Sequence, residues 1–340
     1  MAVSLRFLVL IFALAVTACA PRLAPPGPGP AAPRLDVAES VFQARDGTRL
    51  PMRAWLPKGD AAPKALILAL HGFNDYSHAF AAPGAYLAIQ DIATFAYDQR
   101  GFGAAPNRGL WAGTGALTQD LVDAARALRA RYPGVPLYLL GDSMGAAVVT
   151  VAITGFEGGP EAPAVDGIIL AAPAVWARSA MPWPYRVALW ISAHTVPWMD
   201  VSGNGLGIQA SDNIEMLRAL GRDPLVLKET RVDAVDGLVD LMDQALAAAP
   251  KITVPALLLY GEKDQVIPAD PILRFWRDLP TAARPNQRRA LYANGWHMLL
   301  RDLQARVVLD DIVQWIADPN APLPSGAEAH ALSRLEAKTE

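Results

Sequence analysis

A serine between two glycines, Ser143 in the stretch GDSMG (141–145), has the surroundings that point most clearly to chemistry. The stretch follows the apolar run LYLL and precedes AAVVTVAI, which has a helical composition. In the order strand, G-x-S-x-G, helix, the serine lies on a sharp turn where a side chain two positions away on either side would meet neighbouring backbone. Its Oγ is then exposed at a helix N-terminus, facing amide N–H groups. The pattern predicts a nucleophile; a surface turn that happens to match is the alternative.

An acid and a histidine follow Ser143 in the chain order that such a nucleophile requires. Asp264 comes just after the apolar run ALLLY, where parallel sheets place their ligands, and His297 lies in GWHML on a loop before the last helix. We expect Asp264 to hold the imidazole in one tautomer, so that its other nitrogen takes the Ser143 proton. The weaker competitors are the acids Glu262, Asp270, Asp278 and Asp166 and the histidines His78, His194 and His330.

A second set of backbone donors is expected in the loop HGFNDYS (71–77). Gly72 allows close approach of backbone, so the N–H groups of Phe73 and Met144 can form an oxyanion hole for the reacting carbonyl. His71 more plausibly braces this loop than carries a proton. The sequence has five histidines and neither an HExxH motif nor a Cys/His cluster, so we expect no metal and no cofactor.

The segments that must position these residues alternate between short apolar runs and helical spacing. Near-continuous apolar runs are typical of parallel strands buried on both faces, and a hairpin through Asp46-Gly47 leads into them. The pattern predicts a mostly parallel α/β sheet. The expected strands are 65–70, 92–97, 137–140, 168–172 and 256–260, and the clearest helices are 117–132, 237–249 and 307–317.

One stretch breaks this alternation. Between residues 172 and 256 there is no comparable strand, yet the stretch holds four of the 9 tryptophans. We interpret it as a cap, at about 174–235, inserted over the sheet. Trp183 and Trp190 are predicted to bind substrate at the mouth of the Ser143 pocket; packing within the cap's own core is the alternative.

The N-terminus has the features of an export signal. A basic residue, a ten-residue apolar run and the stretch VTAC, which resembles a bacterial lipobox, predict a lipoprotein signal peptide over 1–19 with lipidation at Cys19, the only cysteine. Ordinary cleavage after Ala20 is the alternative. A proline-rich linker (20–36) would then act as an extended spacer, and residues 319–340 would form a flexible tail. The expected location is the bacterial cell envelope, anchored to a membrane.

The charge balance narrows the partners. The net charge is −3 and the sequence has no dense run of lysine and arginine, which argues against a nucleic-acid partner.

Taken together, the motifs resemble α/β-hydrolases of the monoacylglycerol lipase and lysophospholipase group, also classed as serine aminopeptidase-type hydrolases. The blocks HGFNDYS, YDQRGFGAAPNRG, LYLLGDSMG, YGEKDQVIP and GWHML carry the resemblance. It implies an α/β-hydrolase domain over 37–318, with about eight strands and helices on both faces. Asp142 departs from the histidine common before the serine; we expect it to face away and bind loop N–H groups, and an effect on the pKa of His297 is the alternative. Asp98 and Arg100 are expected to pair.

The expected activity is hydrolysis of acyl esters, monoacylglycerols or lysophospholipids, through an acyl-enzyme on Ser143. One alternative is an aminopeptidase that uses Asp212 and Glu215 to hold a free amine. Another is a thioesterase or acyltransferase with the same triad. A non-catalytic binding lipoprotein is the alternative from another class.

Overall fold

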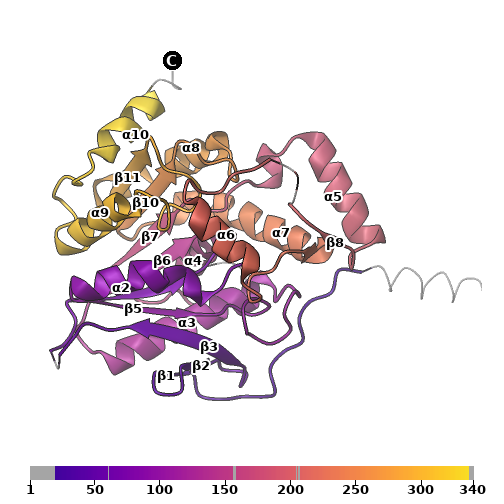
Figure 1. Ribbon diagram of the computed structural model, residues 1–340, viewed down its shortest axis with the longest axis horizontal. Coiled ribbons are helices and arrows are strands. Elements are labelled where there is room, and N and C mark those ends of the chain that lie inside the picture. The colour runs from indigo at the N-terminus through magenta and orange to yellow at the C-terminus, as the bar shows by residue number, and fades with distance from the viewer. Residues whose placement is uncertain (1–19, 60, 156–157, 204, 206, 337–340) are drawn as a thin grey trace, which may run out of the picture.

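A mixed sheet of nine strands forms the centre of the protein (Figure 1). The computed structural model describes residues 20–59, 61–155, 158–203, 205 and 207–336. The strands are β1 (Arg34–Asp36), β2 (Val41–Gln43), β3 (Arg49–Trp55), β4 (Ala65–Leu70), β5 (Ile92–Tyr97), β6 (Leu137–Asp142), β7 (Gly167–Ala171), β10 (Ala256–Gly261) and β11 (Gln287–Tyr292). Their order is β1-β2-β3-β5-β4-β6-β7-β10-β11, and the six from β5 to β11 are parallel. The α/β-hydrolase fold with a mostly parallel sheet is confirmed.

Each central strand contributes to a core on both faces of the sheet. All six residues of β4 are buried: Leu66, Leu68 and Leu70 join one hydrophobic cluster, and Ala65, Ile67 and Ala69 join the other. Successive side chains of a strand point to opposite faces, so a strand that is apolar at every position needs cover on both sides.

Helices supply that cover. They are α2 (Ala81–Ile89), α3 (Thr114–Arg131), α4 (Met144–Thr154), α5 (Trp183–Thr195), α6 (Ile214–Arg222), α7 (Val232–Ala248), α8 (Ala269–Asp278), α9 (Ala305–Ala317) and α10 (Ala327–Glu336). Buried residues of α3, α4, α7 and α8 pack in one cluster, and those of α2 and α9 in the other. The expected hairpin forms between β2 and β3, which pair antiparallel across Gly47 at φ 77°.

The stretch that we interpret as a cap runs from the end of β7 to the start of α7. It contains α5, α6 and a small antiparallel pair, β8 (Asp200–Val201) with β9 (Thr230–Arg231). In Figure 1, α5 stands apart from the sheet at the edge of the molecule. Among the described residues, none of the helices combines the length and hydropathy that a membrane span requires.

The proline-rich segment differs from the spacer that we expected. It is extended, as its prolines predict, but it lies along the domain: Arg22 N–H donates to Asp233, Ala24 N–H to the Trp111 carbonyl, and Gly27 N–H to Asp46. Prolines cannot donate hydrogen bonds, so the donors come from the residues between them. The chain is therefore held against the domain from Arg22 onward.

The C-terminal residues form a helix where we expected a flexible tail. Over the described part, α10 packs beside β11, with Ala331 fully buried in the core. Arg288 of β11 pairs with Glu328, and His330 lies 3.0 Å from Glu262. The helix covers the edge strand of the sheet, which would otherwise expose unpaired backbone groups.

Candidate active site

Ser143 lies on a strained turn between β6 and α4. Its φ of 53° is unusual for a residue with a side chain. A Cβ atom added at Gly141 would lie 2.3 Å from the Cα of Ala146, and one at Gly145 would lie 2.1 Å from the Leu70 carbonyl oxygen. Both contacts are with backbone and cannot relax, so the turn requires glycine at both positions.

The structure brings Ser143, His297 and Asp264 together. His297 Nε2 lies 3.0 Å from Ser143 Oγ, and His297 Nδ1 lies 2.8 Å from Asp264 Oδ2. The Asp264 side chain is fully buried and that of His297 is 8% exposed. The other carboxylate oxygen of Asp264, Oδ1, accepts from the backbone N–H groups of Val266 and Ile267, at 2.7 and 2.9 Å. These three contacts fix the orientation of the carboxylate.

The pKa of His297 reflects opposing influences. Burial lowers it, but the negative charge and hydrogen bond of Asp264 and the charge of Asp142 raise it, and the net result is a pKa above the ordinary value. Arg301 acts in the opposite direction to the two carboxylates. The imidazole is therefore a stronger base than a free histidine.

The competing acids and histidines have other partners. Glu262 faces His330, and Asp278 pairs with Arg274 on α8. Asp166 accepts from the N–H of Leu137 at the opposite, N-terminal end of β6. Of these acids, Asp264 is the one that a hydrogen bond joins to His297, the histidine beside Ser143, over the described residues.

The loop after β4 passes directly against the serine. A Cβ atom at Gly72 would lie 3.3 Å from the Ser143 Cβ, so the Phe73 backbone is close to the reacting atom. In the part of the chain that the structure describes, the Phe73 N–H has no hydrogen-bond acceptor. Met144 is the first residue of α4, where an amide has no intrahelical acceptor. Both N–H groups are therefore available to an acceptor beside Ser143, and their role as oxyanion donors stays a prediction.

His71 braces this loop. Its Nε2 accepts from the Gln99 N–H at 2.9 Å, and its Nδ1 donates to the Gly72 carbonyl at 2.8 Å. One nitrogen accepts and the other donates, which defines the neutral imidazole, and burial lowers the pKa of His71. The expectation that it is a structural histidine agrees with these contacts.

A cap loop that the sequence reasoning did not single out also supports the oxyanion loop. The Leu227 N–H donates to the Asn74 carbonyl at 2.9 Å, and the Asn74 side chain donates to Thr230 Oγ1 at 2.7 Å. The Tyr76 hydroxyl donates to Asp223 at 2.7 Å. Asn74 itself has φ 66°, so these bonds hold it in a conformation that it rarely adopts alone. Residues 223–230 thus connect the cap to the oxyanion loop.

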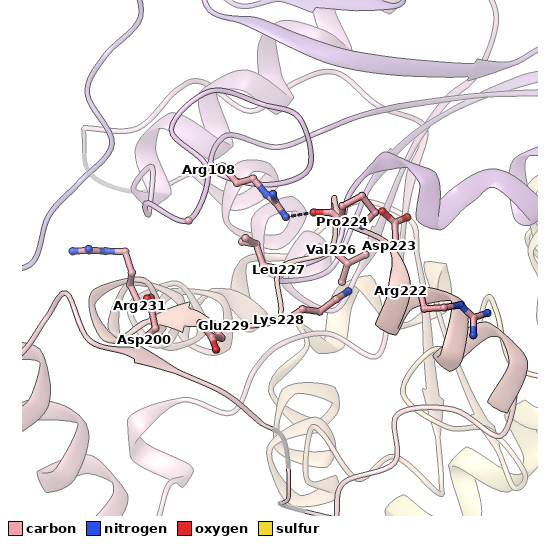
Figure 2. Close-up of a pocket in the computed structure, with 11 residues that line it drawn as sticks. Arg108, Asp200, Arg222, Asp223, Pro224, Val226, Leu227, Lys228, Glu229 and Arg231 are labelled. Carbon is pink, nitrogen blue, oxygen red and sulfur yellow. Dashed lines mark hydrogen bonds between the residues drawn. The ribbon is translucent and has the colours of Figure 1, made fainter.

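The same cap loop lines an open hollow of about 560 Å³ (Figure 2). None of its lining residues belongs to the triad. Arg108 donates to the Pro224 carbonyl at 2.5 Å and Arg231 bonds to Asp233. Figure 2 shows the side chains of Arg108, Arg222, Lys228 and Arg231 pointing in different directions, interspersed with Asp200, Asp223 and Glu229. The hollow therefore has no converging set of cations for an anionic ligand.

Asp142 and two residues that we had not predicted form a charged group beside the triad. Arg301 donates to Asp75 at 2.6 Å, and both side chains are about 10% exposed or less. Asp142 is buried and its Oδ1 has no hydrogen-bond partner among the described residues. The expectation that it binds loop N–H groups is therefore wrong for this atom. Arg301 follows His297 by four residues, and this spacing could have indicated from the sequence that Arg301 lies near the triad.

The expected pair between Asp98 and Arg100 does not form. Arg100 instead makes two-pronged contacts with Asp46 and with Asp120, at 2.6–2.9 Å. Asp98 accepts from the N–H groups of Ser77 and Ala104. Both residues follow the end of β5, where the chain leaves the strand and turns, and each meets partners from other segments instead of the other. Both still brace loops, but separately.

The remaining predicted residues lie elsewhere. Trp183 and Trp190 on α5 are 71% and 62% exposed, so most of each indole faces outward and neither packs in the cap's core.

Cys19 lies outside the described residues. Asp212 accepts from the Leu303 N–H at 2.9 Å, and Glu215 pairs with Arg218 on the surface.

Comparison with known proteins agrees with this geometry. The model of the family described as serine aminopeptidase, S33, matches residues 61–304. The human monoglyceride lipase is 25% identical over 281 residues, covering 81% of this chain and 89% of that protein. The monoacylglycerol lipase of Mycolicibacterium smegmatis is 24% identical, covering 82% and 96%.

A solved structure shows the same fold. A soluble variant of the Saccharomyces cerevisiae monoglyceride lipase, in complex with a substrate analog, superposes with a TM-score of 0.68 at 20% identity, over 87% of this chain and 99% of that one. The family match covers most of the chain, and the two relatives above are named monoglyceride lipase and monoacylglycerol lipase. The chain belongs to the serine aminopeptidase S33 family of α/β-hydrolases, and it is a serine ester hydrolase.

Proposed function

We propose that Ser143, His297 and Asp264 form the catalytic triad and that hydrolysis proceeds through an acyl-enzyme. The Oγ–H proton passes to His297 Nε2 as Oγ bonds to the ester carbonyl carbon. The oxyanion rests on the N–H groups of Phe73 and Met144, and His297 gives the proton to the departing alcohol. Water then attacks the acyl-enzyme by the same route. The continuous chain of contacts from Ser143 Oγ to the buried Asp264 is the observation that carries this proposal.

The proposed substrates are monoacylglycerols or lysophospholipids, which are esters of one acyl chain with a polar alcohol. Two relatives of similar length are named as monoglyceride or monoacylglycerol lipases, and a fold neighbour was solved with a substrate analog. The loop 223–230, which joins the cap to the oxyanion loop, would let the cap respond to a chain bound beneath it.

Acyl chain length provides the test. Each methylene buried stabilises the bound chain by ~0.8 kcal/mol, so kcat/KM for p-nitrophenyl esters should rise roughly fourfold per added carbon until the pocket is full. Initial rates with esters of four to twelve carbons measure this rise. Trp183→Ala should preserve it, because that indole is exposed. A flat profile together with fast cleavage of aminoacyl amides would contradict the lipid-ester proposal.

The aminopeptidase alternative has less support in the geometry. It needs carboxylates free to hold an amine, but Asp212 accepts from a backbone N–H and Glu215 is in a surface ion pair. A non-catalytic role would leave the strained serine and the aligned histidine without purpose, because strain persists only where surrounding structure maintains it. Ester hydrolysis accounts for both.

We propose that the protein is a lipoprotein of the bacterial cell envelope, anchored at Cys19. Arg22, three residues later, is held at Asp233 at the start of α7, so an anchor would attach within about 11 Å of extended chain from that point. The described chain begins on the cap side of the molecule, close to β8 (Figure 1). Trp183, Tyr185, Trp190 and Trp198 are exposed on the cap, and aromatic side chains of this kind favour the membrane interface.

Two changes test this arrangement separately. Cys19→Ser should abolish incorporation of radioactive palmitate and release the protein from membranes.

In the fragment that starts at Pro21, Trp183→Ala with Trp190→Ala should weaken sedimentation with phosphatidylcholine vesicles several-fold, because two exposed indoles are lost from the apolar surface. Thr195→Ala on the same helix is the control. Absence of palmitate label in the wild type would remove the lipoprotein proposal.

A further inference from the structure

Asp142, the residue before the nucleophile, carries a buried charge that the triad does not use. It ends β6, is 5% exposed, and its Oδ1 accepts no hydrogen bond within the described ranges. Burying a carboxylate without donors is costly unless a positive charge lies close. The groups that face it must therefore explain why it is tolerated here.

Four charged or titratable groups from other loops interact electrostatically with Asp142. Burial raises the pKa of Asp142 to about 6, although Arg301 and His297 act to lower it, and Asp75 and Asp302 raise it further. The other two carboxylates have donors of their own. Asp75 is bound by Arg301, and Asp302 accepts from Ser211 and from the Trp296 N–H. Asp142 is the carboxylate of this group that depends on the charges of Arg301 and His297.

The same interaction acts on His297. Three groups dominate its surroundings: Asp264 through a hydrogen bond, Asp142 through space, and Arg301 in the opposite sense. Arg301 is held at Asp75 in the oxyanion loop, so part of its charge is already balanced. Charge interactions across a water-excluded site are stronger than those in solvent. Asp142 is thus a second negative charge, after Asp264, that raises the pKa of the imidazole.

We propose that Asp142 is a positioning residue that acts through His297, where its carboxylate, together with Asp264, stabilises the imidazolium formed when Ser143 gives up its proton. Asp264 stabilises the imidazolium through its hydrogen bond at Nδ1, and Asp142 stabilises it through its charge. A histidine at position 142, as is common in the group that the sequence resembles, could not supply this negative charge. The inference rests on the proposed roles of Ser143 and His297 but not on the identity of the substrate.

Asp142→Asn in the full chain tests the proposal through the pH dependence of ester hydrolysis. A nearby negative charge raises the pKa of a histidine, so its removal lowers that pKa. His297 works as a base only when deprotonated, so the acid limb of kcat/KM for p-nitrophenyl butyrate should move to lower pH by about one unit. The plateau should fall by up to about tenfold, because one pKa unit is a factor of ten.

The control is Asp311→Asn. Asp311 is as deeply buried and accepts from the Tyr292 hydroxyl, but it is not among the groups that act on His297. This change can lower the melting temperature, but it should leave the acid limb in place. A merely structural role for Asp142 predicts the same behaviour for both variants.

An NMR titration of the His297 ring separates this inference from the proposed function. It should show a lower pKa in Asp142→Asn than in the wild type, whether or not the enzyme turns over a given ester. An unchanged or higher His297 pKa would overturn the proposal. If the wild type neither hydrolyses p-nitrophenyl esters nor reacts with a fluorophosphonate, the triad assignment fails and the catalytic role of Asp142 falls with it, while the titration still reports the coupling.

Discussion

Replacing Ser143 by alanine is expected to lower kcat/KM for ester hydrolysis by about 10⁶-fold, the size of loss seen when a serine nucleophile is removed from a triad. The reason is that only its Oγ can bond to the carbonyl carbon while His297 receives the proton. The fold should survive, because the side chain caps no helix and its hydrogen bond is to His297. Initial rates with a p-nitrophenyl ester and the thermal melting temperature measure the two effects.

A fluorophosphonate probe gives the control for this variant. It should label the wild type at Ser143, and Ser192→Ala, a change at a half-buried serine of α5, should label as the wild type does. Label that persists in Ser143→Ala would show that the nucleophile is another residue. Loss of label together with a collapsed melting temperature would instead show that position 143 supports the fold.

The central strands β4 and β5 could be predicted because they are buried on both faces. β4 and β5 have the bounds that the apolar runs indicate, since no charged residue interrupts them. β11 was missed because Arg288 and Arg289 stand in its middle. Arg288 reaches Glu328 on α10, so its charge is paired by a helix about forty residues away. A sequence pattern reports burial well but not the partner that makes a charge acceptable within a strand.

The same limit explains which parts of the site were foreseen. Ser143, Asp264 and His297 each follow the C-terminal end of a parallel strand, so topology alone brings them to one edge of the sheet. Arg301 and Asp75 are separated by 226 residues and Arg100 and Asp46 by 54, and only the folded chain shows which acid each arginine meets. The charged group around Asp142 belongs to this second kind.

Changing Asp264 to asparagine is expected to lower kcat by about 10⁴-fold, as in the serine-protease triad that loses its acid. In this protein the reason can be traced to individual atoms. Oδ1 accepts from the N–H groups of Val266 and Ile267, so the amide oxygen of an asparagine must take that place and its NH₂ group must face His297. An amide donor at Nδ1 forces the proton onto Nε2, the nitrogen that has to accept from Ser143.

In Asp264→Asn, the two backbone N–H groups that hold Oδ1 therefore impose the wrong tautomer on His297. Single-turnover rates with a p-nitrophenyl ester should show the loss in the acylation step, while fluorophosphonate labelling slows in proportion because it needs the same base. Glu262→Gln is the matched control, since Glu262 lies two residues earlier and faces His330 rather than His297. If Asp264→Asn retained full activity while Glu262→Gln lost it, the acid of the triad would be Glu262. With Oδ1 held by Val266 and Ile267, we expect the reverse.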